Sequence, residues 1–246
     1  MRLTIPINYC PVTIEVDPVD LFFKYSAWQR PYRKNGFQPN DIIESEFEAL
    51  TASWTHTFKK LADNGVFKKS PNVMIDVGTG LGLLPILLSK YFAFANTEFI
   101  LIDRPRIDNV TVYQSYDNAH GFYTGFELFE RMIEVNNIDR KRFTILDPDS
   151  SWPGKAELVV STLSWCWHYP RLVYWSRLIN SLTPGGIVSV DMSNWTNEDS
   201  RKEFSSYFQC DPAVIPISSY PHQFPNAWTI DSDGNRGYSC AWTNNL

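Results

Sequence analysis

The sequence predicts an α/β protein with a doubly wound, mostly parallel sheet of seven strands and helices on both faces, together with an N-terminal helical or irregular cap. Two observations lead to this fold class. From residue 72 onward, short apolar runs alternate with segments of helical pattern, which is typical of parallel strands covered on both faces. A glycine-rich turn also follows the first apolar run and precedes a helix, as in nucleotide-binding folds.

The elements follow in chain order. Strands are expected at about Val73–Val77, Phe99–Ile102, Phe143–Leu146, Leu158–Val160, Ile187–Asp191, Ala213–Ile217 and Gly237–Thr243. Helices are expected at about Asp41–Leu61, Leu83–Phe94, Ala119–Asn136, Arg171–Leu182 and Asn197–Phe208. The first helix has an N-cap candidate in Asp41 with Glu44 at the capping-box spacing, and Asn64-Gly65 would end it. Pro85 is tolerated in the first turn of the next helix.

Residues 1–70 differ in character from the rest of the chain. The apolar pieces Leu3–Ile7 and Val12–Val16 are interrupted by prolines, and an aromatic and basic stretch follows them. We therefore expect residues 1–70 to form a cap or substrate lid, and residues 71–246 to form the domain that carries the glycine-rich turn.

The composition limits the function classes. The chain has 246 residues, which suits one domain with a small appendage, and its formal net charge is −5. An acidic chain lacks the basic footprint of a general nucleic-acid binder. No stretch approaches the roughly 20 apolar residues that cross a bilayer, and none of the four cysteines forms a C-x-x-C pair. We expect a cytoplasmic protein with free thiols and with neither a nucleic-acid nor a membrane partner.

The sharpest motif is I-D-V-G-T-G-L-G, Ile75–Gly82. Its three glycines allow a tight turn and close approach of a ligand. A dinucleotide-binding loop, G-x-G-x-x-G, would need its third glycine at position 83, where this chain has Leu83. Asp76 precedes the first glycine by two positions, and its carboxylate would repel a pyrophosphate but attract a positively charged amino acid. No G-K-[ST] follows, which excludes a P-loop.

This loop resembles motif I of the class I S-adenosylmethionine-dependent methyltransferases, which have a Rossmann-like fold. The resemblance covers Asn72 to the C-terminus, with further landmarks in order: Asp103 in I-L-I-D-R for the ribose hydroxyls, Asp147 in T-I-L-D-P for the adenine amino group, E-L-V-V-S-T-L-S-W, and T-P-G-G. It implies S-adenosylmethionine as the methyl donor. The implied donor-binding residues are Asp76, Gly78, Thr79, Gly80, Gly82, Asp103, Arg104, Asp147 and Ser161.

The acceptor segment of such enzymes follows the fourth strand, and here it reads S-T-L-S-W-C-W-H-Y-P, Ser161–Pro170. It lacks the [DNS]-P-P-[YFW] sequence of amino-directed methyltransferases, and it is similar to the corresponding stretch of sugar O-methyltransferases. His168 is the candidate general base, since an imidazole can take a hydroxyl proton; a packed histidine is the alternative. The candidate pocket walls are Trp165, Trp167 and Tyr169, each of which could instead belong to the core.

The long insert between the second and third strands contains Y-Q-S-Y-D-N-A-H-G-F-Y, residues 113–123. Amides, carboxylates and aromatic faces of this kind typically hold polyhydroxylated ligands, although a surface loop is the alternative. The candidate acceptor residues are Tyr116, Asp117, Asn118 and His120. Asp191 and Asn194 follow the fifth strand, but the fourth strand ends in Ser161 rather than an acid, so we expect no obligatory metal.

These features favour an O-methyltransferase that acts on a hydroxyl of a small molecule, such as a sugar or a glycosylated metabolite. An N-methyltransferase or an aminopropyltransferase of the same fold is one alternative, although the acceptor segment has no acidic residue to hold a polyamine. A methyltransferase-like binding protein without catalysis is another. The sequence leaves the acceptor, the oligomeric state and the choice of base between His168 and His120 open.

Overall fold

The computed structural model describes residues 1–7, 10–19, 21, 43–103, 126–162, 164–166, 171–193, 197–218 and 235–245. The strands within these residues are β1 (Arg2–Ile7), β2 (Cys10–Glu15), β3 (Val73–Val77), β4 (Glu98–Ile102), β5 (Phe143–Leu146), β6 (Ala156–Ser161), β7 (Leu182–Ser193), β8 (Ala213–Ser218) and β9 (Asn235–Thr243). The α-helices are α2 (Ile43–Asp63), α3 (Leu83–Ser89), α4 (Glu127–Val135), α5 (Trp175–Ser181) and α6 (Asn197–Phe208). Short 3₁₀ turns are η3 (Val66–Lys68), η4 (Phe92–Phe94), η5 (Arg140–Arg142) and η6 (Arg171–Val173).

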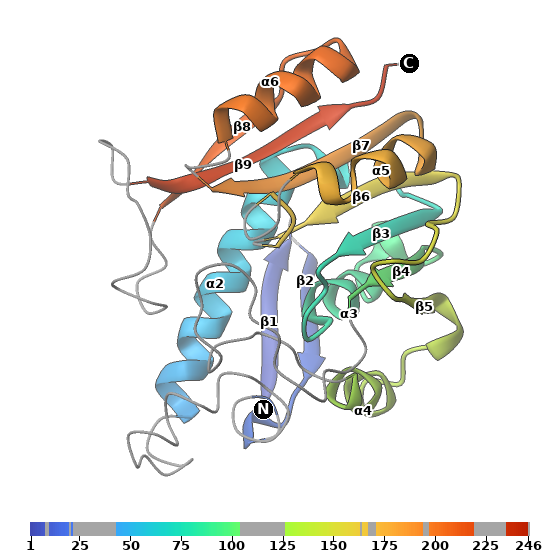
Figure 1. Cartoon of the computed structure of the whole chain (residues 1–246). Helices are drawn as coiled ribbons and strands as arrows, with labels where there is room; N and C mark the ends of the chain where they lie inside the picture. The colour runs from blue at the N-terminus through green and yellow to red at the C-terminus, as the bar shows by residue number, and fades with distance from the viewer. Residues whose placement is uncertain are drawn as a thin grey trace.

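The main sheet has seven strands in the order β5-β4-β3-β6-β7-β9-β8 (Figure 1). β3 pairs in parallel with both β4 and β6, and β6 pairs in parallel with β7. β9, which contains the expected strand Gly237–Thr243, is antiparallel to both β7 and β8. The strand order reverses between β3 and β6. Ligands of open α/β sheets bind outside the carboxyl ends of the strands at such a point.

Each face of this sheet is covered by its own hydrophobic cluster. Met74 of β3 packs in a cluster that includes α2, α3 and α4, while its neighbour Ile75 packs in a second cluster with α5 and α6. The alternation arises because successive side chains of a strand point to opposite faces. Both faces of the central strands are therefore apolar, and this accounts for the continuous apolar runs in the sequence.

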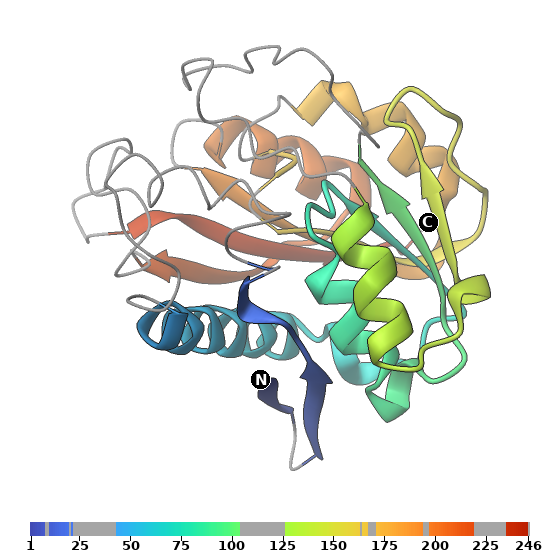
Figure 2. The ribbon, with the colours of Figure 1, turned by 90° about the horizontal axis from the view of Figure 1, so that it is seen from below.

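The N-terminal segment begins with a β-hairpin rather than with helical or irregular chain. β1 and β2 pair antiparallel from Arg2↔Glu15 to Ile7↔Cys10, and alternate residues of β1 are buried. The hairpin packs on α2 and α3 (Figure 2), and Asn136 at the end of α4 exchanges hydrogen bonds of 2.7 and 2.9 Å with the backbone of Glu15. The same hydrophobic cluster includes Leu3 and Leu87, so the core continues across residue 70.

Helix α2 contacts the sheet through buried polar side chains. Lys60 forms an ion pair of 2.9 Å with Asp191 of β7, and each side chain is 2 % exposed. One turn later, Asn64 donates to Ser239 of β9 at 2.9 Å and to Ser189 of β7 at 3.4 Å. From Lys60 to Asn64 the helix advances four residues, about 6 Å, while the partners on β7 go back two residues, about 6.6 Å. α2 therefore runs antiparallel to β7, and the two contacts are evenly spaced. We call Lys60, Asn64, Ser189, Asp191 and Ser239 the α2 seam.

Two helices end or begin differently from the sequence prediction. α3 ends at Ser89, and η4 replaces its expected last turn. The expected helix Arg171–Leu182 is divided into η6 and α5, and α5 ends at Ser181 because Leu182 already pairs with Ala156 of β6. α4 begins at Glu127, and residues 119–125 of the expected helix lie outside the described residues. No helix in the described part of the chain combines the length and apolar composition needed to span a membrane.

Candidate functional site

The glycine loop follows β3 at the point where the strand order reverses, and each of its glycines has a positive φ. A Cβ on Gly78 would lie 1.8 Å from Ser164 Oγ, and one on Gly82 would lie 2.3 Å from Phe129 Cδ2. A Cβ on Gly80 would meet no atom of the described residues within 4 Å. The outer two glycines thus allow close packing within the chain. Gly80 faces open space that a ligand can approach.

Asp103 lies beside that open space. It follows β4, and its Oδ2 accepts a hydrogen bond of 2.7 Å from the backbone N–H of Gly80. Its own N–H donates to the carbonyl of Leu146 at the end of β5. Asp147 is the next residue, and its exposed side chain accepts from the N–H of Asp149 at 2.8 Å. The two acids predicted to bind ribose and adenine therefore lie at the carboxyl ends of adjacent strands.

Asp76 lies within β3 and is 2 % exposed. Its Oδ2 accepts a hydrogen bond of 2.7 Å from the hydroxyl of Thr79 in the loop. Burial raises the pKa of Asp76 to about 7; the Thr79 hydrogen bond opposes this rise, and the nearby charge of Asp103 adds to it. A cation bound next to this carboxyl would therefore favour its ionised form near neutral pH.

Ser161, predicted to bind the donor, connects two segments of the chain. Its hydroxyl donates to the carbonyl of Val77 at 2.9 Å and accepts from the N–H of Trp165 at 2.8 Å. The side chain is 1 % exposed. The hydroxyl thus joins the end of β3, just before the glycine loop, to the start of the acceptor segment.

Trp165, predicted as a pocket wall, lies in the core. It is 0 % exposed, and its ring contacts Tyr174 edge-on at 5.9 Å and Phe204 at 5.7 Å. A contact with an acceptor would need surface that these rings cover, so the structure supports the packing interpretation of this residue. The next residue, Cys166, is also buried and has a φ of 62°, in the left-handed region that non-glycine residues rarely adopt.

The remaining candidates cannot be placed. The residues predicted for the base, the donor site and the acceptor site that lie outside the described residues are Arg104, Tyr116, Asp117, Asn118, His120, Trp167, His168 and Tyr169. Asn194, considered for metal binding, also lies outside them. Their roles stay predictions from the sequence.

Sequence reasoning missed the partner of Asp191. From the sequence, Asp191 is considered only as a possible metal ligand and no obligatory metal is expected, whereas the structure pairs this carboxylate with the buried ammonium of Lys60. His56 lies one turn before Lys60, and burial, followed by the charge of Lys60, lowers its pKa. The spacing of four between His56, Lys60 and Asn64 could have indicated this, because it places the first two on one face of α2 and the third in line with them just after the helix ends. Within the described ranges, no three His, Cys, Asp or Glu side chains are grouped to hold a metal ion.

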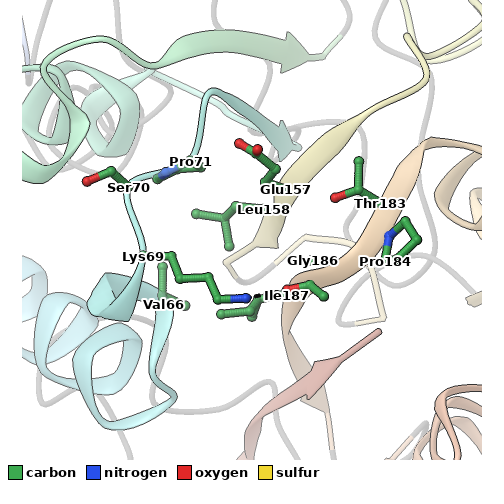
Figure 3. A pocket seen from close by; sticks show the side chains of 11 residues that line it. Val66, Lys69, Ser70, Pro71, Glu157, Leu158, Thr183, Pro184, Gly186 and Ile187 are labelled. Atoms are coloured by element: carbon green, nitrogen blue, oxygen red, sulfur yellow. Dashed lines mark hydrogen bonds between the residues drawn. The ribbon is translucent and has the colours of Figure 1, made fainter. Parts of the chain in front are cut away.

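A cavity of about 260 Å³ lies at the opposite edge of the sheet, near the amino ends of β6 and β7 (Figure 3). Lys69 donates to the carbonyl of Gly185 at 3.0 Å on one side of it, and Glu157 on another side accepts from Asn72. The lining residues are Val66, Lys69, Ser70, Pro71, Glu157, Leu158, Thr183, Pro184, Gly185, Gly186 and Ile187. This cavity is separate from the glycine loop, which lies at the carboxyl ends of the strands.

No protein-family model and none of the curated protein sequences matches this chain. Solved structures do. The StiE O-MT, residues 961–1257, is similar with a TM-score of 0.52 and 13 % identity over 88 % of this chain and 81 % of that chain. The O-methyltransferase TomG from Streptomyces achromogenes is similar with a TM-score of 0.42 and 13 % identity, over 75 % of this chain and 78 % of that chain. An rRNA methylase from Streptococcus thermophilus has a TM-score of 0.44 and 8 % identity, over 76 % of this chain and 95 % of that chain.

At these identities the comparisons concern the fold and not the acceptor. The observed sheet has the predicted seven, mostly parallel strands, and its glycine loop lies at the switch point of the strand order. The chain therefore has the Rossmann-like fold of the class I S-adenosylmethionine-dependent methyltransferases.

Proposed function

We propose that this protein is an S-adenosylmethionine-dependent O-methyltransferase of a small hydroxylated molecule, such as a sugar or a glycosylated metabolite. The observation that carries the proposal is the open space at Gly80, bordered by the Asp103 carboxylate at the switch point of the sheet. A loop glycine whose Cβ position is unobstructed by the described residues, with an acid beside it, fits a nucleoside with free ribose hydroxyls.

The donor-binding roles are those that the family resemblance implies, and the positions of these side chains are compatible with them. Asp103 would accept hydrogen bonds from the ribose hydroxyls, Asp147 would bind the adenine amino group, and Asp76 with Thr79 would lie toward the amino-acid end. When bound, S-adenosylmethionine supplies a methyl group activated by a sulfonium. Transfer of that group is an in-line displacement, so much of the protein's contribution is positioning.

The residues proposed to bind and activate the acceptor are proposed from the sequence alone. His168 would take the proton from the acceptor hydroxyl while the new carbon–oxygen bond forms, because a hydroxyl is a poor nucleophile at neutral pH. The proposed acceptor contacts are Tyr116, Asp117, Asn118, His120, Trp167 and Tyr169. Trp165 would support this segment from the core, where its ring packs against Tyr174.

We expect Asp76→Ala and Asp103→Ala each to weaken binding of S-adenosylmethionine or S-adenosylhomocysteine by about 1–3 kcal/mol, the usual scale for losing a hydrogen bond to a charged group. Isothermal titration calorimetry measures this directly. Asp149→Ala is a matched control, since this acid also follows β5 but is not proposed to touch the donor. Tight NAD binding by the parent, or no binding of either S-adenosyl ligand, would contradict the proposal.

Donor affinity should increase with pH through about pH 7. Because burial raises the pKa of Asp76 to about 7, the carboxyl is largely protonated below that pH and must lose its proton to pair with the donor's ammonium group. Affinity should therefore fall by up to about tenfold per pH unit below this value and level off above it. Calorimetry between about pH 6 and 8 measures the slope, and Asp76→Asn, which cannot ionise, should flatten it. An equally steep slope in that variant would assign the proton to another group.

Binding of S-adenosylhomocysteine without turnover on a broad panel of hydroxylated acceptors would instead favour a methyltransferase-like binding protein. Transfer to an amine rather than a hydroxyl would favour N-methylation.

A further inference from the structure

Three contacts connect the glycine loop with the start of the acceptor segment. The hydroxyl of Ser161 bridges the carbonyl of Val77 and the N–H of Trp165, at 2.9 and 2.8 Å. Just beyond this bridge, Ser164 lies against Gly78 so closely that a single added Cβ would overlap its side chain. The loop and the segment thus cannot move independently without breaking a buried hydrogen bond or opening this packed junction.

The other end of the loop faces the proposed donor. The N–H of Gly80 donates to Asp103, beside the open space. Gly80 is two residues from Gly78, and Val77 directly precedes Gly78. A ligand that restricts the backbone at Gly80 therefore acts on the same short turn that Ser161 contacts at Val77 and Ser164 contacts at Gly78.

The segment beyond Ser161 is also held in an unusual conformation. Cys166 is buried with a φ of 62°, and a non-glycine residue stays in this region only where the surrounding structure determines it. The hydrogen bond that the N–H of Trp165 donates to the Ser161 hydroxyl holds the residue directly before Cys166.

We propose that Ser161 is a positioning residue that couples occupancy of the donor loop to the conformation of residues 164–166. Ser161 acts through the hydrogen bonds of its hydroxyl and does not touch the donor. Binding at Gly80 then restricts the backbone of residues 164–166 before an acceptor arrives, because energetic coupling travels through contiguous contacts of this kind. This inference rests on the proposed function, in that an S-adenosyl ligand must bind the loop.

Hydrogen–deuterium exchange of the full chain tests the coupling with S-adenosylhomocysteine as the probe, so no acceptor is needed. In the parent, saturating ligand should slow amide exchange both at residues 78–82 and at residues 164–166, by about tenfold or more. In Ser161→Ala, saturating ligand should still protect residues 78–82, whereas the ligand-dependent protection of residues 164–166 should be lost. A merely structural role would raise exchange in both states equally and leave the ligand-dependent difference intact.

Ser161→Thr keeps a hydroxyl and should restore the protection. Ser89→Ala is the matched control: its buried hydroxyl donates to Ile86 within α3 at 2.6 Å and contacts neither segment, so the coupling should persist in this variant. If Ser161→Ala does not fold, Ser164→Ala tests the packed junction instead and should reduce the transmitted protection.

The outcomes separate the two proposals. If the parent binds the ligand and Ser161→Ala still transmits protection to residues 164–166, the coupling role is wrong while donor binding stands. If the parent binds no S-adenosylhomocysteine by calorimetry, the proposed function is wrong. The coupling proposal is then wrong as well, because it requires this ligand to bind the loop.

Discussion

Lys60→Met is expected to lower the free energy of unfolding by about 3–5 kcal/mol, the usual cost of removing one partner of a buried ion pair. Lys60 and Asp191 are each 2 % exposed and lie 2.9 Å apart. Without the ammonium, the Asp191 carboxylate would stay buried next to an apolar side chain, in a seam where water cannot solvate it. Urea denaturation followed by circular dichroism measures the change in stability.

Two variants make this test specific. Lys59→Met, one position earlier on α2, removes an exposed ion pair with Asp63, so it should change stability by at most about 1 kcal/mol. The double variant Lys60→Met with Asp191→Leu should recover much of the lost stability, because apolar side chains of similar volume often replace a buried pair at little cost. A single Lys60→Met variant as stable as Lys59→Met would show that the pair is not desolvated in solution.

His168→Ala is expected to lower kcat by about 100-fold or more once an acceptor is identified, because assistance by a general base is typically worth about 10²–10⁴ in rate. The acidic limb of the pH–rate profile should disappear with the imidazole, since this limb reports protonation of the base. Steady-state kinetics across pH measures both effects, and calorimetry should show unchanged donor affinity.

His120→Ala must be measured in parallel, since the polar insert that contains it is the other proposed source of a base. If His120→Ala loses kcat while His168→Ala keeps it, the base belongs to the insert. If neither variant changes the rate, positioning alone accounts for catalysis and the proposed proton transfer to a histidine is wrong. Asp191 is a poor substitute, because Lys60 already pairs with its carboxylate.

Local patterns in the sequence predicted the strands of the sheet and the glycine loop. Apolar runs such as Val73–Val77 are short and bounded by turn residues, which is the pattern of strands buried on both faces. The positions of Asp103 and Asp147 could also be predicted, because each acid directly follows a strand and parallel strands end at the same edge of the sheet. These features depend on neighbours in the chain, so a single sequence suffices for them.

Only the tertiary structure decided the contacts between distant segments. Lys60 and Asp191 are 131 positions apart, and Ser161 and Val77 are 84 apart. The sequence does not show which group meets the Lys60 ammonium or the Ser161 hydroxyl, because each partner lies far away along the chain. The hairpin of β1 and β2 and the burial of Trp165 depended likewise on what packs against them. Burial and partner are properties of the assembled core, because the cost of a buried charge or hydroxyl is set by the group that meets it.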